Sequence, residues 1–241
     1  MRVYCTEIAD PGDSLCGIIE TAMGRLVFLP GFACRSWIWE RVVPALEVRW
    51  ACELLDWPLD ETKGFADLEG FADWIIRSHG PALASADAVV GHSMGGLLAL
   101  MLCAGGRAAR AVLVDTQLTP PDPFFRSLLA PGTDEPTRRA VGRMARECSP
   151  HFHPSLRGRL KAGDFAGLAK AGPAASAVYG MRGCAEPRLV REHLGWPGWL
   201  ERRVACRFVP ASAHFPMLEN PPGFLAALTA LLDPGQGRGR P

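Results

Sequence analysis

The sequence lacks an excess of charge of either sign, because its 241 residues carry 26 basic and 25 acidic side chains for a formal net charge of +1. Near-neutrality argues against a protein that attracts nucleic acid electrostatically and against an acidic, disordered chain. The sequence also lacks a long apolar run: the longest, residues 94–106, ends at Arg107 and is too short to span a bilayer. We therefore expect neither nucleic acid nor a membrane as a partner.

Closely spaced cysteines are missing as well. The eight cysteines stand singly, without a C-x-x-C pair, so the local ligand spacing of a metal cluster is absent. Residues 1–7 do not offer the apolar run of a signal peptide. We expect the cysteines to be reduced core residues of a cytoplasmic protein that needs neither a metal nor a cofactor.

Short apolar runs alternate with segments of helical period along the chain. Residues 65–76 and 224–232 place apolar side chains at helical spacing on one face. This alternation predicts an α/β fold with a mostly parallel, doubly wound sheet that helices cover on both faces. Residues 1–21 are expected to add an antiparallel edge hairpin that turns at 11–13. The candidate strands are residues 26–29, 86–90, 111–114, 176–179 and 204–209.

Residues 119–175 break this alternation. They contain no convincing strand, many prolines, and nine basic against five acidic residues. We expect one domain over residues 1–241, in which 119–175 forms a small, positively charged helical cap over one end of the sheet. Residues 233–241, rich in glycine, proline and arginine, are expected to form a disordered tail.

The strongest chemical signal is the G-x-S-x-G motif at residues 91–95, with Ser93 at its centre. An apolar run precedes the motif and a helical run follows it, so we expect the chain to turn sharply from strand to helix at the serine. Such a turn exposes the hydroxyl at the carboxyl edge of the sheet and aims the N-terminus of the helix at it. Ser93 is therefore a candidate nucleophile.

A serine nucleophile needs a base positioned beside it. His214 fits best among the six histidines, because it follows the last apolar run by a short loop and so lies at the same sheet edge as Ser93. The side chain of His92, inside the motif, is expected to point away from that of Ser93. His151 and His153 fall in the predicted cap and are candidates for lining a pocket there.

Three segments together resemble the α/β-hydrolase superfamily, and the resemblance covers nearly the whole chain. Residues 29–32 (Leu-Pro-Gly-Phe) are similar to a family turn at the end of a strand, residues 91–96 to its nucleophile elbow, and residues 213–221 to its histidine loop. The resemblance implies an α/β-hydrolase fold and hydrolysis through a serine nucleophile.

The resemblance also implies a role for individual residues of the site. Ser93 would be the nucleophile and His214 the general base. The backbone amides of Phe32 and Met94 would form the oxyanion hole, since each occupies the position from which the family donates an amide. No cofactor and no metal are implied.

The acid of the triad departs from the family pattern. The usual aspartate follows the penultimate strand in a run like G-x-x-D, and the run that starts at Gly180 has Gly183 at that position. Asp115, after the run 111–114, could supply the carboxylate from one strand earlier, as in thioesterase domains and some lipases of the superfamily. Glu186 could reach in instead, or no acid could be present. We favour Asp115, because the imidazole needs a group that fixes its tautomer.

These expectations combine into a serine hydrolase that cleaves a carboxylic ester or thioester through an acyl-enzyme on Ser93. The expected partner is a small-molecule acyl ester or thioester, either free or linked to a carrier. Three alternatives stay open: a thioesterase of acyl-carrier type, an enzyme that resembles hydroxynitrile lyases, and a member that binds a ligand without catalysis.

Overall fold

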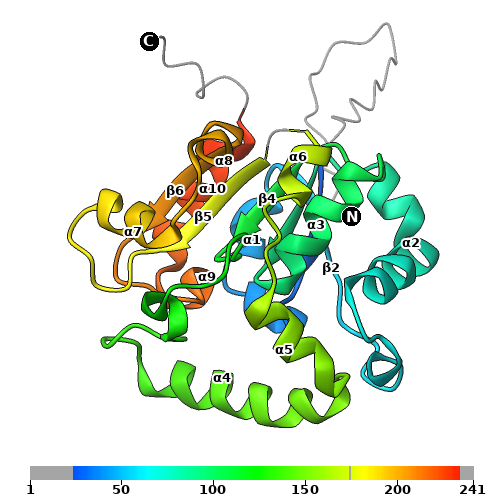
Figure 1. The fold of residues 1–241 in the computed structure, drawn as a ribbon, viewed down its shortest axis with the longest axis horizontal. Helices are drawn as coiled ribbons and strands as arrows, with labels where there is room; N and C mark the ends of the chain where they lie inside the picture. The colour runs from blue at the N-terminus through cyan, green and yellow to red at the C-terminus, as the bar shows by residue number, and fades with distance from the viewer. Residues whose placement is uncertain (1–23, 174, 234–241) are drawn as a thin grey trace, which may run out of the picture.

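The computed structural model describes residues 24–173 and 175–233, which form one six-stranded sheet (Figure 1). All neighbouring strands are parallel, in the order β2-β1-β3-β4-β5-β6. Helices surround the sheet, so the predicted parallel α/β fold is confirmed. The hairpin predicted for residues 1–21 lies outside the described residues. The strands are β1 (Gly24–Leu29), β2 (Trp50–Leu54), β3 (Ala88–His92), β4 (Ala111–Val114), β5 (Ala175–Gly180) and β6 (Val204–Val209).

The central strands are continuous apolar runs because helices cover them on either side. Val27 of β1, Val90 of β3 and Leu113 of β4 have no exposed surface. β3 begins two residues later than the predicted run 86–90 and continues through His92. The turn at Ser93 therefore starts directly at the end of the strand.

The sequence pattern did not predict β2. Its residues lie at one edge of the sheet and are mostly half-buried, so the strand accommodates Glu53 and shows no continuous apolar run. Glu53 pairs with Arg25 of the neighbouring strand at 3.4 Å. An edge position thus removes the signal by which the other strands were recognised.

The helix predicted over 65–76 is longer in the structure. α2 (Leu68–Ala84) is capped by Asp67, whose carboxylate accepts a hydrogen bond from the Gly70 amide at 3.2 Å. Phe71 and Ile75 are buried on its predicted apolar face. The helix continues through a kink at His79. The other helices outside the β4–β5 connection are η1 (Ser36–Trp39), α1 (Val43–Leu46), η2 (Thr62–Gly64), α3 (Met94–Ala104), α7 (Pro187–Leu194), α8 (Gly198–Arg203), α9 (Pro216–Glu219) and α10 (Pro221–Leu232).

The chain between β4 and β5, residues 115–173 of the described part and here called the β4–β5 segment, contains helices but no strand. Its longest helix, α4, is capped by Asp134, whose carboxylate accepts a hydrogen bond from the Thr137 amide at 2.8 Å. Figure 1 shows α4 and α5 beyond the carboxyl ends of the strands. The helices of the segment are η3 (Pro123–Arg126), α4 (Glu135–Cys148), η4 (Ser149–His151), α5 (Pro154–Ala162) and α6 (Leu168–Ala171).

The predicted tail falls almost wholly outside the described residues. Its first residue, Asp233, is described, and its carboxylate pairs with Arg49 at 2.7 Å. Within the described ranges, no helix combines the length and the apolar composition needed to cross a bilayer.

Candidate active site

Ser93 lies at a strained turn between β3 and α3. Its backbone has φ 51° and ψ −116°, in a region that non-glycine residues rarely adopt. The flanking glycines are required by space: a Cβ on Gly91 would lie 2.1 Å from the carbonyl oxygen of Gly95, and one on Gly95 would lie 2.6 Å from that of Leu29. The chain therefore makes the strand-to-helix turn that the motif predicts.

The last residue of β4 and the loop that follows it hold this turn in place. The amide of Ser93 donates a hydrogen bond to the carbonyl oxygen of Val114 at 2.8 Å, and the hydroxyl of Thr116 donates to the carbonyl oxygen of Ser93 at 3.0 Å. A Cβ on Gly96 would lie 2.1 Å from the Thr116 hydroxyl oxygen. Thr116 was not singled out from the sequence, because nothing local marks a threonine as the partner of a distant turn.

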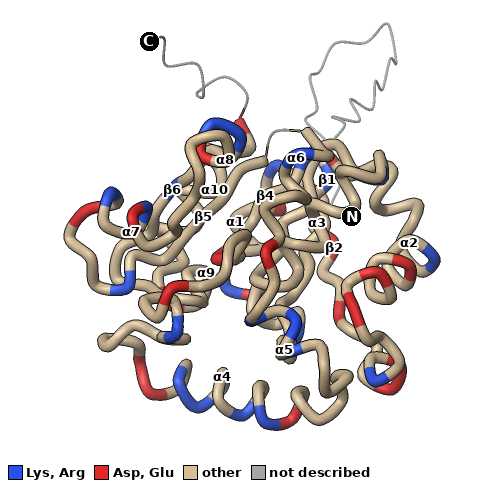
Figure 2. The backbone as a smooth tube through the Cα atoms, in the orientation of Figure 1, with Lys and Arg blue, Asp and Glu red and all other residues tan. Residues whose placement is uncertain are grey.

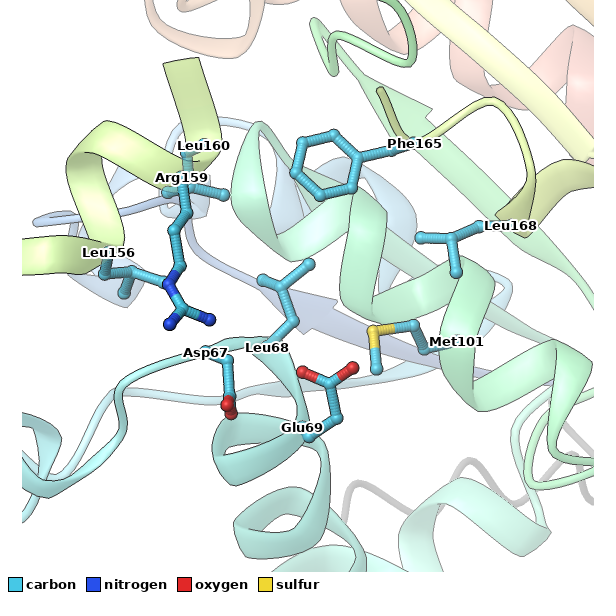
Figure 3. A pocket seen from close by; sticks show the side chains of 9 residues that line it. All are labelled: Asp67, Leu68, Glu69, Met101, Leu156, Arg159, Leu160, Phe165 and Leu168. Atoms are coloured by element: carbon cyan, nitrogen blue, oxygen red, sulfur yellow. The ribbon is translucent and has the colours of Figure 1, made fainter. Parts of the chain in front are cut away.

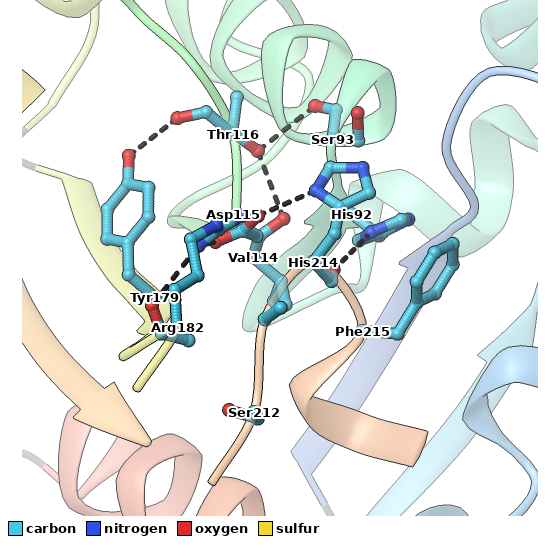
Figure 4. Close-up of polar contacts among 12 residues, drawn as sticks. His92, Ser93, Val114, Asp115, Thr116, Tyr179, Arg182, Ser212, His214 and Phe215 are labelled. Atoms are coloured by element: carbon cyan, nitrogen blue, oxygen red, sulfur yellow. Dashed lines mark hydrogen bonds and ion pairs between the residues drawn. The ribbon is translucent and has the colours of Figure 1, made fainter. Parts of the chain in front are cut away.

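The structure brings His214 and Asp115 into contact. The Nδ1 of His214 lies 2.6 Å from Oδ2 of Asp115, which directly follows β4 and is fully buried. Figure 4 draws Ser93 and Asp115 on opposite sides of the His214 ring. The two carboxyl-edge loops thus place an acid and an imidazole beside the elbow serine.

The alternative acid lies elsewhere. Glu186 is exposed at the start of α7, and its carboxylate is 3.8 Å from Arg188. Gly183, at the usual acid position, has φ 83° and no heavy atom near where a Cβ would be. Asp115 is therefore the carboxylate that contacts His214 in this structure.

Asp115 has a second partner, Arg182, that was not predicted from the sequence. Both of its oxygens accept hydrogen bonds from the guanidinium of Arg182, Oδ1 from Nη1 at 2.9 Å and Oδ2 from Nη2. The side chains of Arg182 and Asp115 are 3% and 0% exposed. Burial alone would raise the pKa of Asp115, but the charge of Arg182 and the hydrogen bonds from His214 and Arg182 outweigh it and keep this pKa well below its usual value.

His92 packs against the loop that carries His214. Its Nε2 donates a hydrogen bond to the carbonyl oxygen of His214 at 2.8 Å, and the two ring centroids lie 4.5 Å apart. Burial and the neighbouring charge of His214 lower the pKa of His92 to about 3, so His92 is neutral at neutral pH. Only the orientation of this histidine was predicted from the sequence, because the contact joins two segments that are far apart along the chain.

The carboxylate of Glu219 fixes the backbone on both sides of His214. Its Oε2 accepts hydrogen bonds from the amide of Ala213 at 2.8 Å and from that of Phe215 at 3.1 Å. Two charge-assisted hydrogen bonds, from the amides before and after His214, restrict the loop that orients the imidazole. Glu219 lies in the segment 213–221 that resembles the family loop, but its role was not foreseen.

The β4–β5 segment is bonded to the same loop. Oε1 of Glu219 accepts hydrogen bonds from the amide of Ala130 at 2.6 Å and from the hydroxyl of Thr133 at 2.7 Å. The amide of His214 donates to the carbonyl oxygen of Leu128 at 3.2 Å. The start of the segment and the histidine loop therefore form one hydrogen-bonded unit.

The two amides expected to form an oxyanion hole occupy the predicted turns. Phe32 follows β1, and its turn is fixed by a 2.9 Å hydrogen bond from Nε1 of Trp57 to the carbonyl oxygen of Gly31. The ring of Phe32 packs on that of Phe152, with centroids 4.7 Å apart. Met94 is the first residue of α3, so its N–H has no partner within the helix.

The two histidines of the β4–β5 segment direct their hydrogen bonds away from this site. Nδ1 of His151 lies 3.1 Å from the carbonyl oxygen of Leu59, and Nδ1 of His153 accepts from the amide of Ser155 at the start of α5. Within residues 24–173 and 175–233, no three His, Cys, Asp or Glu side chains gather as a metal site would require.

The described residues also enclose two cavities, neither of which is lined by Ser93, Asp115 or His214. A cavity of about 170 Å³ (Figure 3) lies between α2, α3, α5 and α6. A wider cleft of about 390 Å³ lies between η1 and α4, and its lining includes Arg35, Trp37 and Arg143. Arg35 follows Phe32 by three residues in the sequence, but Phe32, Met94, Ser93 and His214 do not line this cleft.

Comparisons with known proteins agree with the fold. Three solved structures are similar over most of their length: a putative aryl esterase from Burkholderia cenocepacia (22% identity, TM-score 0.61, 88% of this chain and 90% of that one), a bacterial membrane phospholipase A (18%, 0.67, 88% and 79%) and the thioesterase domain of the curacin biosynthetic pathway (14%, 0.55, 88% and 91%). At these identities the likeness concerns the fold alone.

Comparison with curated protein sequences gives no match. The model of the alpha/beta hydrolase family matches residues 26–228, which include both the serine turn and the histidine loop. This match covers most of the sequence and agrees with the parallel sheet described above. The chain therefore belongs to the alpha/beta hydrolase family.

Proposed function

We propose that this protein is a serine hydrolase that cleaves a carboxylic ester or thioester through an acyl-enzyme on Ser93. The observation that carries the proposal is the 2.6 Å contact between Nδ1 of His214 and Oδ2 of Asp115 beside the strained turn of Ser93. A nucleophile, a base and a carboxylate that orients the base are the parts this chemistry needs. The esterases, lipases and thioesterases among the similar structures support the reaction class at the level of the fold.

The proposed reaction starts with proton transfer from the Ser93 hydroxyl to Nε2 of His214 as the serine oxygen attacks the acyl carbonyl. No described residue accepts a hydrogen bond from this hydroxyl, so substrate binding would have to bring Oγ and Nε2 into reach, as is common for catalytic contacts. The amides of Phe32 and Met94 would stabilise the negative oxygen.

His214 then gives its proton to the departing alkoxide or thiolate, which leaves an ester between the acyl group and Ser93. A water molecule, deprotonated by His214, attacks this ester; the bond to the serine oxygen breaks, His214 returns the proton to that oxygen, and the acid is released. Asp115 keeps the imidazole in the tautomer with hydrogen on Nδ1 and stabilises the imidazolium in both steps. This chemistry uses only side chains and amides of the chain.

We further propose that the β4–β5 segment acts as the cap that limits substrate size. The loop between η3 and α4 is bonded to the histidine loop, and α4 forms one side of the cleft of about 390 Å³ that it shares with η1. A small-molecule acyl ester or thioester would enter between α4 and η1.

The charge of this segment does not by itself favour a carrier-linked acyl group. Figure 2 shows basic residues along the middle of α4 and acidic residues towards its two ends. The guanidinium of Arg138 is bonded to carbonyl oxygens, including that of Thr133 at 2.9 Å, and Arg139 pairs with Glu135 at 3.3 Å. A free small-molecule ester or thioester is therefore our first candidate, and a carrier-linked thioester is the second.

Labelling with a fluorophosphonate probe tests the nucleophile. We expect the native protein to be labelled, the Ser93→Ala variant to be inert, and the Ser85→Ala variant, changed at an exposed serine after α2, to label like the native protein. A native protein that does not react would contradict a catalytic serine and favour a ligand-binding role.

Hydrolysis assays then separate the enzyme classes. Release of p-nitrophenol from esters and of thiol from acyl thioesters, each over a series of chain lengths, measures both the bond and the acyl group preferred. A protein that is labelled at Ser93 and hydrolyses neither series would contradict the hydrolase and favour a lyase.

A further inference from the structure

Arg182 and Asp115 form a buried pair with two parallel hydrogen bonds. The guanidinium reaches across from the loop after β5 to the residue after β4, and both side chains are almost fully enclosed. A planar guanidinium that binds both oxygens of a carboxylate leaves it no freedom to rotate. The pair therefore fixes the plane of the Asp115 carboxylate.

The same carboxylate oxygen serves two partners. Oδ2 of Asp115 accepts hydrogen bonds from Nη2 of Arg182 and from Nδ1 of His214. Because Arg182 sets the direction in which this oxygen points, it also sets the position of the imidazole. No contact between Arg182 and Ser93 is needed for this effect.

Arg182 is itself fixed from several sides. Its backbone, with φ 50°, donates a hydrogen bond to the carbonyl oxygen of Ser212 at 2.8 Å, in the loop that carries His214. Nη1 also donates to the carbonyl oxygen of Gly180 at 3.1 Å, and the guanidinium lies over the ring of Phe125 at 4.7 Å. The group thus has one orientation in which it meets Asp115.

We propose that Arg182 is a positioning residue of the active site, which acts through Asp115 to orient His214. The loop after β5 then supplies the cation that holds the acid, while the loop after β4 supplies the acid itself. This inference rests on the function proposed above. It gives the β5 loop a role in this chain although Gly183 stands where an aspartate would be expected.

A purely structural ion pair would behave differently from a positioning residue. Loss of a stabilising pair lowers the free energy of unfolding but leaves the folded molecules with unchanged turnover. Loss of a positioning group lowers kcat of the folded molecules, whereas KM changes little because Arg182 is buried behind Asp115 and is not expected to contact substrate.

The kinetic test uses Arg182→Gln and Arg182→Lys, with Arg203→Gln as the matched control. Arg203 is half-buried and also donates hydrogen bonds, to the carbonyl oxygens of Ala169 and Gly172. It directly precedes β6 and so lies at the amino end of that strand, whereas the proposed site lies at the carboxyl ends. We expect Arg182→Gln to lower kcat about 10- to 100-fold, with KM within about twofold.

The kcat values of the two remaining variants should depend on which contacts of Asp115 each variant retains. Arg182→Lys retains the charge without the paired geometry and should fall between the native protein and Arg182→Gln. Arg203→Gln should retain native kcat. If Arg182→Gln does not fold, Arg182→Lys decides, because it keeps the buried carboxylate paired with a cation. Native kcat in every folded Arg182 variant would overturn the proposal.

A second readout does not depend on activity. The Nδ1 proton of His214, in a short hydrogen bond to Asp115, should give a low-field proton NMR resonance that the His214→Asn variant lacks. We expect this resonance to be retained in Arg203→Gln, and to be broadened or lost in Arg182→Gln, where the carboxylate can rotate.

These readouts separate the two proposals. Failure of the native protein to react with the fluorophosphonate probe would refute the proposed function alone, and the resonance would still decide the role of Arg182. A labelled, active native protein whose Arg182→Gln variant keeps both kcat and the resonance would refute the positioning role alone.

Discussion

His92 and His214, 122 residues apart in the sequence, are joined by a hydrogen bond of 2.8 Å from Nε2 of His92 to the carbonyl oxygen of His214. The bond requires hydrogen on Nε2, and burial keeps the ring neutral. The imidazole next to the nucleophile is thus a support for the loop of the proposed base.

This support predicts an acid sensitivity of folding. The pKa of His92 is lowered to about 3 in the folded protein, whereas an unfolded histidine titrates near pH 6.5. Between these values the unfolded chain binds a proton that the folded protein does not, so the free energy of unfolding falls as the pH falls below about 6.5. At pH 5 the loss from this group is about 2 kcal/mol.

Urea unfolding of the native protein and of His92→Gln at pH 7 and pH 5 measures this loss. The glutamine amide can still donate a hydrogen bond but does not titrate. We expect the variant to lose about 2 kcal/mol less than the native protein between the two pH values. Equal losses would contradict a neutral, buried His92.

Replacing the proposed triad acid should abolish most of the activity. Asp115→Asn retains the shape of the side chain but permits the wrong imidazole tautomer, so we expect kcat to fall about 10⁴-fold with little change in KM. The control is Glu186→Gln, which alters an exposed carboxylate at the start of α7 and should retain native kcat. A rate within a few-fold of native in Asp115→Asn would remove Asp115 from the triad.

The same carboxylate should stabilise the fold over a wide pH range. The folded pKa of Asp115 lies well below the unfolded value of about 4, so its contribution to the free energy of unfolding is complete above about pH 5. It decreases as the pH falls below 4 towards the folded pKa. The stability difference between the native protein and Asp115→Asn should therefore be constant from pH 8 to pH 5 and shrink only below pH 4; a difference that shrinks above pH 5 would contradict a lowered pKa.

The elbow should not accept a methyl group. A Cβ on Gly95 would lie 2.6 Å from the carbonyl oxygen of Leu29 and 2.7 Å from that of Pro30, so Gly95→Ala must displace the turn that leads to Phe32. We expect a loss of about 2 kcal/mol or more in thermal or urea unfolding, together with reduced kcat. Gly158→Ala in α5 is the control: its Cβ meets nothing within 4 Å, and it should stabilise the helix by about 0.5–1 kcal/mol.

Glu219→Gln should weaken the hydrogen bonds between the histidine loop and the start of the β4–β5 segment. An amide offers one oxygen where the carboxylate offers two, so either the amides beside His214 or the groups of Ala130 and Thr133 lose their acceptor. We expect kcat to fall about tenfold and amide hydrogen exchange to rise around residues 128–133. Glu192→Gln, at an exposed carboxylate of α7, should alter neither quantity; unchanged exchange in Glu219→Gln would contradict the coupling.

The fold was predictable where local pattern and burial coincide. The buried strands β1 and β4 appear as apolar runs, and the turn at Ser93 follows from glycines that leave room for neighbouring carbonyl groups. β2 was missed because an edge strand tolerates Glu53. The apolar run before the elbow began earlier than β3, because Ala86 is buried before the strand starts.

The residues that contact the proposed triad could not be predicted from the sequence, for a reason other than the one that hid β2. Asp115 and His214 each follow a predicted strand, so topology alone places them at one sheet edge. The roles of Arg182, Glu219 and His92 follow from contacts with groups in loops whose conformations no local sequence pattern specifies. An arginine one residue before a missing aspartate was the only available signal for the first of them.

The contacts between Glu219 and the start of the β4–β5 segment constrain how substrate preference could be changed by exchanging parts between relatives. Two of the four hydrogen bonds that Glu219 accepts come from Ala130 and Thr133. A graft joined before residue 128 would replace Ala130 and Thr133, and also Leu128, whose carbonyl oxygen accepts the hydrogen bond from the His214 amide. A graft joined after Thr133 would exchange α4, α5 and α6 while leaving the histidine loop intact. The choice of junction, more than the choice of helices, decides whether such a chimera keeps its catalytic geometry.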